Sequence, residues 1–226
     1  MASSSLRFYI DTADVSIWRT WLSTGLFYGV TCNPLLLERA NVPCNIETLQ
    51  KLTLQAEDLG AREIHLQAWG DSVVSLIKVG RELDSLGENV VVKLPATQMG
   101  TTAAAALVRH HSVRVTLTAI YEVHQVLIAA AIGADYAAPY LGRINDLGRK
   151  GIDELVKMQR SLDGTHSRVR LLTASIRSVE DITTLAAAGV DTFTFSDAIA
   201  QSLFNVPDTI KATADFERAA REGASG

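Results

Sequence analysis

The segment 89-NVVVKLPAT-97 decides the fold class, because it joins the pattern of a buried strand to a lysine at the end of that strand. Three consecutive valines are typical of a parallel strand that is covered on both faces. Pro95 cannot donate a hydrogen bond to a neighbouring strand, so we expect the strand to end just after Lys93. Lysine is seldom buried, and the carboxyl ends of strands are where α/β folds carry their chemistry. Lys93 is therefore the first candidate for a functional residue.

Short β-branched or aromatic runs alternate with helical patterns along the whole chain. We expect eight strands, at 7–11, 28–31, 63–67, 89–93, 113–118, 134–139, 169–174 and 190–195. Helices are expected between them, for example at 46–60, 71–87, 119–133, 151–164 and 178–189, with Asp71 and Ser178 as N-caps. Two further helices, 197–204 and 207–220, follow the eighth strand, and Pro207 opens the second of them.

Eight strand–helix units in 226 residues predict an α/β protein, a single (β/α)₈ TIM barrel with an extra C-terminal helix. The alternative is an open doubly wound sheet, but no glycine-rich nucleotide-binding motif follows any strand. We expect residues 7–221 to form the barrel with its C-terminal helix. Residues 1–6 and 222–226 are expected to be disordered tails.

Composition and charge narrow the choice of partners and of compartment. The net charge of −4 gives no reason to expect nucleic acid or an anionic membrane as a partner. No apolar run is long enough to span a bilayer. The two cysteines, Cys32 and Cys44, are too few for a disulfide framework and favour a reducing, cytoplasmic location. The opening MASSS could instead be the remnant of a transit peptide, which would place the protein in the plastid stroma.

The strand ends of a barrel face one shared pocket, so the residues there form the candidate site. In chain order they are Asp11, Thr31, Asn33, Gln67, Lys93, Thr118, Tyr140, Arg143, Ser175 and Arg177. A buried, neutral lysine can attack a carbonyl and form a Schiff base, and a nearby carboxylate can move the protons this requires. Arginines hold phosphate through forked hydrogen bonds. If the protein uses covalent amine catalysis, Lys93 is the nucleophile. No metal ligand set and no cofactor are expected.

Several segments are similar to the transaldolase family, and within it to the small fructose-6-phosphate aldolase-like branch. The matching segments are 10-IDTAD-14, 29-GVTCNP-34, 90-VVVKLPAT-97, 115-VTLTAIYEVHQVLIAAAIGADYAAPYLGRIND-146 and 173-TASIRS-178. They span nearly the whole chain in the order of the family. The resemblance implies a (β/α)₈ barrel, sugar-phosphate and small ketose substrates, and a homo-oligomer, a decamer of pentameric rings. The helix at 207–220 would then cross to a neighbouring subunit.

Carried over position by position, the resemblance assigns a role to each residue of the candidate site. Lys93 would form the Schiff base with a ketose donor, Asp11 would move protons, and Thr118 would orient the catalytic water. Asn33, beside Thr31, would hold donor hydroxyls. The phosphate-binding residues would be Arg143, Ser175 and Arg177. Gln67 and Tyr140 are the residues that aldolase-like members carry, whereas true transaldolases carry Glu and Phe.

The resemblance implies cleavage of fructose 6-phosphate to dihydroxyacetone and glyceraldehyde 3-phosphate. The alternative is a transaldolase of the pentose phosphate pathway. The family's Thr-Thr-Asn-Pro-Ser appears here as 31-TCNPL-35, and a typical Leu-Pro near the eighth strand appears as 195-FSD-197. These departures leave open a third hypothesis, a non-catalytic sugar-phosphate-binding scaffold.

Structural alternatives remain for each residue at this point. The Lys93 side chain could extend to water, and Asp11 could cap the first helix. Gln67 and Thr118 could be ordinary buried polar groups. Arg143 could pair with Asp146, and Arg177 could be a solvated loop arginine.

Overall fold

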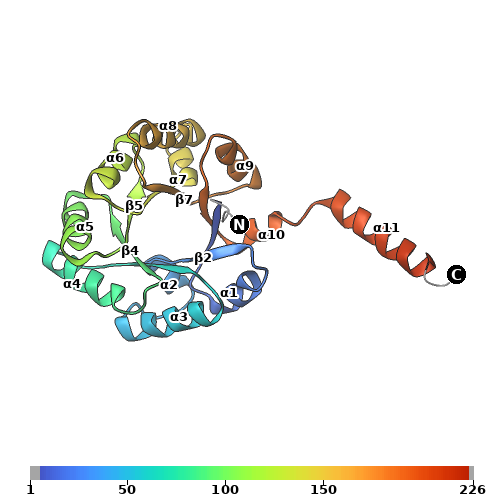
Figure 1. The fold of residues 1–226 in the computed structure, drawn as a ribbon, viewed down its shortest axis with the longest axis horizontal. Coiled ribbons are helices and arrows are strands. Elements are labelled where there is room, and N and C mark those ends of the chain that lie inside the picture. The colour runs from blue at the N-terminus through green and yellow to red at the C-terminus, as the bar shows by residue number, and fades with distance from the viewer. Residues whose placement is uncertain (1–5, 224–226) are drawn as a thin grey trace.

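The computed structural model of the chain describes residues 6–223, which form a closed barrel of eight parallel strands (Figure 1). The strands follow one another around the barrel in chain order, and the first pairs with the eighth. They are β1 (Arg7–Asp11), β2 (Phe27–Thr31), β3 (Glu63–Gln67), β4 (Val90–Pro95), β5 (Val115–Ile120), β6 (Tyr136–Pro139), β7 (Arg170–Thr173) and β8 (Thr192–Phe195). The predicted (β/α)₈ TIM barrel is confirmed.

Helices connect the strands and surround the barrel (Figure 1). They are α1 (Val15–Leu22), α2 (Pro34–Arg39), α3 (Ile46–Asp58), α4 (Val73–Asp84), α5 (Gln98–His111), α6 (Val123–Ile132), α7 (Leu141–Asp146), α8 (Gly151–Gly164), α9 (Val179–Ala187), α10 (Asp197–Ser202) and α11 (Pro207–Gly223). Of the two expected tails, residues 1–5 and 224–226 lie outside the described residues, whereas Glu222 and Gly223 belong to α11.

The helix starts depend on side-chain caps, and one predicted cap is wrong. Ser178 caps α9 as predicted, but α4 is capped by Ser72 rather than by Asp71. The Ser72 hydroxyl accepts a hydrogen bond from the backbone N–H of Ser75 at 3.1 Å, and the Ser75 hydroxyl accepts one from the backbone N–H of Ser72 at 3.0 Å. This reciprocal capping box satisfies two backbone donors, which a carboxylate one residue earlier would not do.

Alternation along the strands divides the apolar residues into two cores. Outward-facing strand residues such as Ile10, Ile64 and Leu94 pack with the helices in the large outer core. The inner core fills the barrel itself and consists of Tyr9, Val91, Tyr136, Ala138 and Leu172, with Tyr28 packed against it. Side chains of a barrel this size fill its interior, so the strands enclose a packed core and not a pore.

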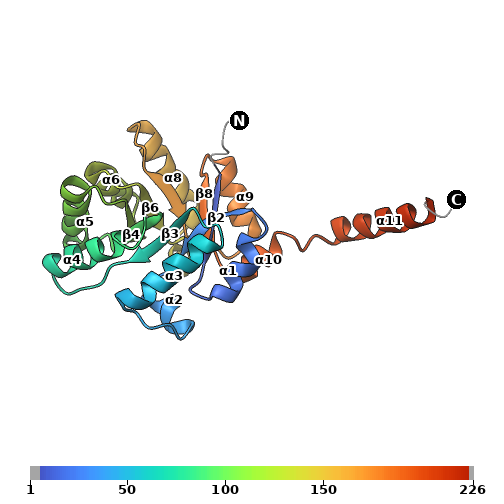
Figure 2. The same ribbon diagram turned by 60° about the horizontal axis from the view of Figure 1, so that its bottom comes forward.

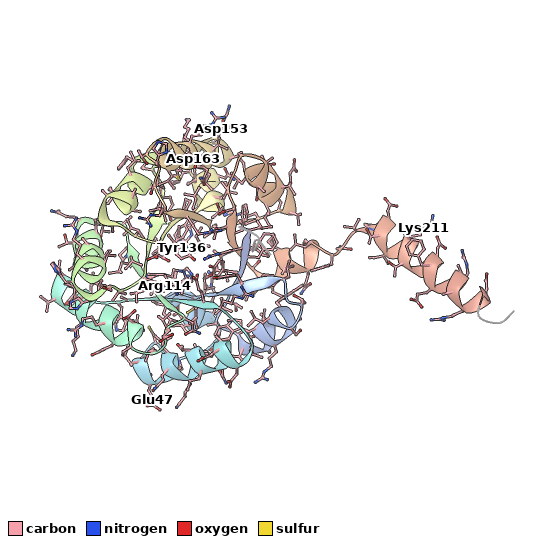
Figure 3. The ribbon with its side chains drawn as sticks, in the orientation of Figure 1. Glu47, Arg114, Tyr136, Asp153, Asp163 and Lys211 are labelled. Carbon is pink, nitrogen blue, oxygen red and sulfur yellow. The ribbon has the colours of Figure 1, made fainter. Side chains whose placement is uncertain are left out.

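The amino-terminal half of the barrel interior holds a buried charge network around Glu63. The hydroxyls of Tyr9 and Tyr136 each donate to Glu63 Oε2 at 2.7 Å, and Arg114 Nη1 donates to Oε1 at 2.7 Å. Burial alone would raise the pKa of Glu63. Hydrogen bonds with His65, Tyr9 and Tyr136 outweigh it and hold that pKa well below its usual value. Arg114 and Tyr136 lie near the middle of the barrel in Figure 3.

The last helix, α11, extends away from the barrel (Figures 1 and 2). None of its residues is buried against the described part of the chain, and Phe216 is 72% exposed. Thr209, Thr213, Phe216 and Ala220 recur at spacings of three and four residues and so share one face of the helix. Lys211, Asp215, Arg218 and Glu222 follow the same spacing on the opposite face. The helix is therefore amphipathic, yet none of the residues on its apolar face is buried by the described part of the chain.

None of the helices in the described part of the chain has both the length and the apolar character that a bilayer crossing requires.

Candidate active site

The carboxyl ends of the strands surround a cavity of about 180 Å³. This volume suits a small metabolite, since sites for drug-sized ligands are roughly 300–1,000 Å³. The cavity is lined by Asp11, Asn33, Leu35, Leu36, Arg39, Lys93, Thr118, Ala138, Tyr140, Arg143, Leu172, Ala174, Ser175 and Thr194. Most of the residues predicted for the site are among them, whereas Thr31, Gln67 and Arg177 are not.

Lys93 lies on β4 and is held inside the cavity. The residue is 5% exposed, so its side chain does not extend to solvent. Its Nζ donates a hydrogen bond to the backbone carbonyl of Cys32 at 3.1 Å. Within residues 6–223 no carboxylate forms an ion pair with this amine. Within that described range the amine is thus bonded to a neutral acceptor, which leaves its lone pair available when the group is unprotonated.

Asp11 ends β1 and supplies a carboxylate to the same cavity. Thr31, its partner in register on β2, donates a hydroxyl to Asp11 Oδ1 at 2.7 Å. The Thr31 hydroxyl also lies 2.6 Å from that of Thr194. Asp11 is not a helix cap, because the N-cap of α1 is Asp14. The hydrogen bond from Thr31 therefore fixes one oxygen of the Asp11 carboxylate, and the carboxylate can exchange protons with a ligand.

Thr118 and Tyr140 form a second polar pair in the cavity. Their hydroxyls lie 2.9 Å apart. The strand register of β5 shifts between Thr118 and Ile120, and Ala119 has a left-handed φ of 58°. This irregularity shifts the pairing just after Thr118, and pairing resumes between Ile120 and Pro139; such bulges are common beside functional sites. The Arg143 guanidinium lies 4.6 Å from the centre of the Tyr140 ring, which adds a cation–π contact.

Ser175 and Gly142 bring the loop after β7 against α7. The backbone N–H of Gly142 donates to the Ser175 carbonyl at 2.9 Å, and Ser175 has a left-handed φ of 58°. A β-carbon at Gly142 would stand 2.5 Å from both the Ser175 carbonyl oxygen and Arg177 Nε. Only glycine permits this close approach. The arrangement places the Ser175 side chain in the cavity on the same side as Arg143.

Arg177 does not line the cavity with Arg143, contrary to the predicted convergence of two arginines. Its guanidinium faces the carboxylate of Asp146, with Nη1 at 2.6 Å from Oδ1, and its side chain is 56% exposed. The same pair excludes the alternative in which Asp146 binds Arg143. The sequence identifies Arg143, Arg177 and Asp146 as candidates for this region, but it does not indicate which arginine pairs with Asp146.

Helix α2 forms the wall of the cavity opposite α7, and it contributes Arg39, which the sequence analysis did not predict. Asn33 caps this helix, because its Oδ1 accepts hydrogen bonds from the N–H groups of Leu35 and Leu36 at 3.0 and 3.1 Å. The Asn33 amide group keeps its own two N–H donors. Arg39, the last residue of α2, also lines the cavity. The signal was available in 33-NPLLLER-39, a capping asparagine with an arginine less than two turns later.

Gln67 and Cys32 lie beside Lys93 without lining the cavity. Gln67 pairs with Lys93 in the β3–β4 register, so both side chains leave the sheet on the same face. Cys32 is fully buried, and burial raises the pKa of its thiol to about 12. The thiol is therefore neutral, and the contribution of Cys32 to the site is its backbone carbonyl.

The charged side chains that line the cavity are Asp11, Arg39, Lys93 and Arg143. Among residues 6–223, no group of three or more His, Cys, Asp or Glu side chains is arranged to hold a metal ion. The arrangement offers a buried amine, a carboxylate, a phenol paired with a hydroxyl, and two guanidinium groups. These are the components of covalent amine catalysis on an anionic carbonyl compound.

Comparison with known proteins places this arrangement in a family. Residues 8–225 match the model of the transaldolase/fructose-6-phosphate aldolase family. A probable transaldolase of Exiguobacterium sibiricum is 32% identical over 220 residues, covering 95% of this chain and 99% of that protein. A probable transaldolase of Phenylobacterium zucineum is 30% identical over 213 residues, covering 93% of this chain and 94% of that protein.

A solved structure of a flavocytochrome b2 variant with sulfite bound is similar in fold, with a TM-score of 0.63 at 12% identity. The match covers 87% of this chain and 59% of that longer one, and it shows the barrel fold alone. The family match and the relatives at 30% identity or more go further, since each extends over nearly the whole sequence. The chain therefore belongs to the transaldolase/fructose-6-phosphate aldolase family.

Proposed function

We propose that this enzyme cleaves fructose 6-phosphate into dihydroxyacetone and glyceraldehyde 3-phosphate, and forms it in reverse, through a Schiff base on Lys93. Membership of the family makes the protein a Schiff-base enzyme of the aldolase and transaldolase type. The observation that carries the choice of residues is the buried amine of Lys93, which shares one cavity with the Asp11 carboxylate.

The reaction follows from the chemistry of an amine and a ketone. The Lys93 amine attacks the C2 carbonyl to give a carbinolamine, which loses water to form an iminium ion. Asp11 takes the proton of the C4 hydroxyl, the C3–C4 bond breaks, and its electron pair moves to the iminium nitrogen. Glyceraldehyde 3-phosphate leaves, and an enamine remains on Lys93. Protonation at C3 and addition of water then release dihydroxyacetone and restore the amine.

Tyr140 is the proposed acid for the protonation at C3. Its hydroxyl lies 2.9 Å from that of Thr118, which can hold the phenol and a water molecule in place. Gln67, the in-register partner of Lys93, is neutral and supports this water without competing for the proton. This combination favours release of the three-carbon unit over its transfer.

Arg143 and Ser175 are the proposed phosphate site, because both line the cavity on the side of α7 and β7. A guanidinium and a hydroxyl supply the charge-assisted hydrogen bonds that a phosphate requires. We propose that Arg177 joins them when substrate binds, which requires its guanidinium to leave Asp146. That pair is exposed, so breaking it costs little.

Transaldolase activity is the second candidate, and the names of the relatives favour it. Both reactions pass through the same enamine on Lys93. In a transaldolase a second aldose captures the enamine before a proton does. The third candidate, a non-catalytic sugar-phosphate-binding scaffold, would bind substrate and never form the enamine.

Borohydride trapping separates a covalent enzyme from a scaffold. Incubation with dihydroxyacetone and borohydride should add the reduced donor to Lys93, as read by peptide mass spectrometry. Lys93→Met should give no adduct, and Lys150→Met, at a lysine outside the cavity, should give the normal adduct. Failure to form an adduct, or an adduct on another lysine, contradicts the proposal.

A product assay with fructose 6-phosphate then separates cleavage from transfer. Free dihydroxyacetone should form without an added acceptor. If sedoheptulose 7-phosphate forms only when erythrose 4-phosphate is present, and no free dihydroxyacetone is found, the enzyme is a transaldolase.

We also propose that the chain assembles into a decamer of pentameric rings through α11. The support is the unpartnered apolar face of this helix, on which Phe216 is 72% exposed; Ile210, on another side of the helix, is also 57% exposed. Light scattering should give a multiple of the subunit mass, and Phe216→Glu should lower it. Lys211→Glu, on the charged face of the same helix (Figure 3), is the matched control and should leave the mass unchanged. A monomeric wild-type protein would contradict the proposal.

A further inference from the structure

The cavity carries guanidinium groups on two opposite walls. Arg143 belongs to α7, which follows β6, and Arg39 belongs to α2, which follows β2. In a closed barrel of eight strands, β2 and β6 lie four strands apart and therefore face each other. Figure 1 shows α2 and α7 on opposite sides of the barrel axis. The proposed phosphate site uses only the wall with Arg143 and Ser175.

Arg39 is held in position by the short helix that carries it. Asn33 caps the start of α2, and the Leu37 side chain, 2% exposed, anchors the helix in the outer core. The helix ends where the N–H of Ala40 donates to the Leu36 carbonyl at 3.1 Å. Arg39 is thus the final residue of a helix that is fixed at both ends; it is exposed to solvent and lines the cavity.

Arg39 receives no counter-charge from the described part of the chain. Across residues 6–223 no carboxylate forms an ion pair with it, whereas Arg177 at the other rim is neutralised by Asp146. Among the described residues that line the cavity, Asp11 is the one carboxylate, and it stands against the positive charges of Arg39, Lys93 and Arg143. An arginine that lines a cavity without an ion-pair partner favours an anionic ligand there, because the guanidinium fork matches phosphate.

We propose that Arg39 recognises a phosphate on the donor half of the substrate, so that the enzyme also cleaves ketoses phosphorylated at both ends. This inference rests on the proposed function, in which Lys93 binds the donor at C2, and on the expectation that Asn33, the N-cap of the helix that carries Arg39, holds donor hydroxyls. The bond that breaks is again C3–C4, and the enamine on Lys93 again takes a proton at C3. The C1 phosphate is carried through unchanged, so the released product is dihydroxyacetone phosphate.

Donor trapping measures this preference directly. The amount of reduced adduct on Lys93 is followed against the concentration of dihydroxyacetone and of dihydroxyacetone phosphate. The half-saturating concentration should be about 10-fold or more lower for the phosphorylated donor, as expected for a charge-assisted hydrogen-bond pair. Arg39→Gln should bring the ratio of the two concentrations close to one. Arg143→Gln, on the opposite wall, should leave the ratio high.

The outcomes distinguish this inference from the proposed function. If dihydroxyacetone alone is trapped, or if the preference survives in Arg39→Gln, or if it depends on Arg143 instead, the role of Arg39 is overturned while the Schiff base stands. Calorimetry on Lys93→Met provides a second measurement without the covalent step. If no donor is trapped on the wild-type enzyme, but Lys93→Met still binds dihydroxyacetone phosphate more tightly than dihydroxyacetone through Arg39, the Schiff base fails and the role of Arg39 stands. If Lys93→Met binds the two donors equally well, the role of Arg39 is overturned, whatever the outcome for the Schiff base.

Discussion

Replacing Glu63 with glutamine should strongly destabilise the barrel, because this carboxylate holds together the polar groups in its amino-terminal half. Glu63 is 3% exposed and accepts hydrogen bonds from Arg7, Tyr9, His65, Arg114 and Tyr136. Glutamine has nearly the same shape, but it lacks the charge and offers an N–H₂ group where one oxygen accepted hydrogen bonds. Donors that converged on two oxygens would then face one oxygen and a competing donor.

The magnitude follows from what remains buried after the substitution. Removing one partner of a buried ion pair costs about 3–5 kcal/mol. Arg7 and Arg114 expose 24% and 37% of their side chains, so water can solvate part of the charge left behind. We therefore expect a loss near the lower limit, about 3 kcal/mol in the free energy of unfolding. For a chain of this size that corresponds to a fall in Tm of roughly 6–12 °C.

Glu47→Gln is the matched control, since it makes the same chemical change at an exposed site. Glu47 pairs with Lys51 at 2.7 Å one turn along α3, and both side chains are mostly exposed (Figure 3). Water screens such an exposed pair, so its loss should change stability little. Thermal and urea unfolding at pH 7 give both values. If the two variants differ by less than about 1 kcal/mol, the Glu63 network does not stabilise the barrel as argued.

Three further changes test other parts of the structure. Burial lowers the pKa of His65 to about 4 from an ordinary 6.5, so the unfolded chain binds a proton that the folded chain does not. Stability should fall by about 2 kcal/mol from pH 7 to pH 5 through this group. Burial raises the pKa values of Asp84 and Asp135, so these carboxyls favour the folded state as the pH falls and partly offset the effect of His65. Urea unfolding should therefore show a smaller loss of stability from pH 7 to pH 5 in His65→Gln than in the wild-type protein, and the difference is the contribution of His65. Tyr140→Phe should slow release of dihydroxyacetone by about 10²-fold or more and leave the Lys93 adduct in place, measured by product formation and by trapping; an unchanged rate would remove Tyr140 as the acid. Gly142→Ala should raise KM for phosphorylated substrates because its methyl group meets the Ser175 carbonyl, whereas Gly164→Ala, with open space around it, should leave KM unaltered.

The strand pattern predicted the barrel because each strand carries its own local signal. The valines before Lys93 indicate a buried strand, and the alternation in 63-EIHLQ-67 separates the two faces of β3, before any partner strand is known. The position of Lys93 followed from the same signal, since Pro95 marks the end of its strand. Burial and strand ends are thus properties that a short segment determines by itself.

The choice of partners across the site could not be predicted in this way. Asp146 pairs with Arg177 and not with Arg143, and nothing in the sequence separates the two arginines. Arg39 reaches the cavity only because α2 is short and ends beside the strand ends. Both outcomes depend on where loops place side chains in space, whereas the sequence pattern fixes only the strands that the loops connect.

Unused hydrogen-bonding capacity distinguishes the two halves of the barrel interior. Strand β3 supplies inward-facing polar residues at alternate positions, and at its start both carboxylate oxygens of Glu63 are fully engaged by neighbours. At the other end of the barrel, the Lys93 amine meets one carbonyl, Asp11 is held through one oxygen, and the Asn33 amide keeps its N–H groups. A buried polar group that its neighbours satisfy completely can only stabilise the fold, whereas one with spare capacity can bind a ligand. By that criterion Lys93 and Asp11 can bind a ligand. Arg39 is exposed, and it joins them because it lines the same cavity without an ion-pair partner among the described residues, whereas Arg177 is paired with Asp146.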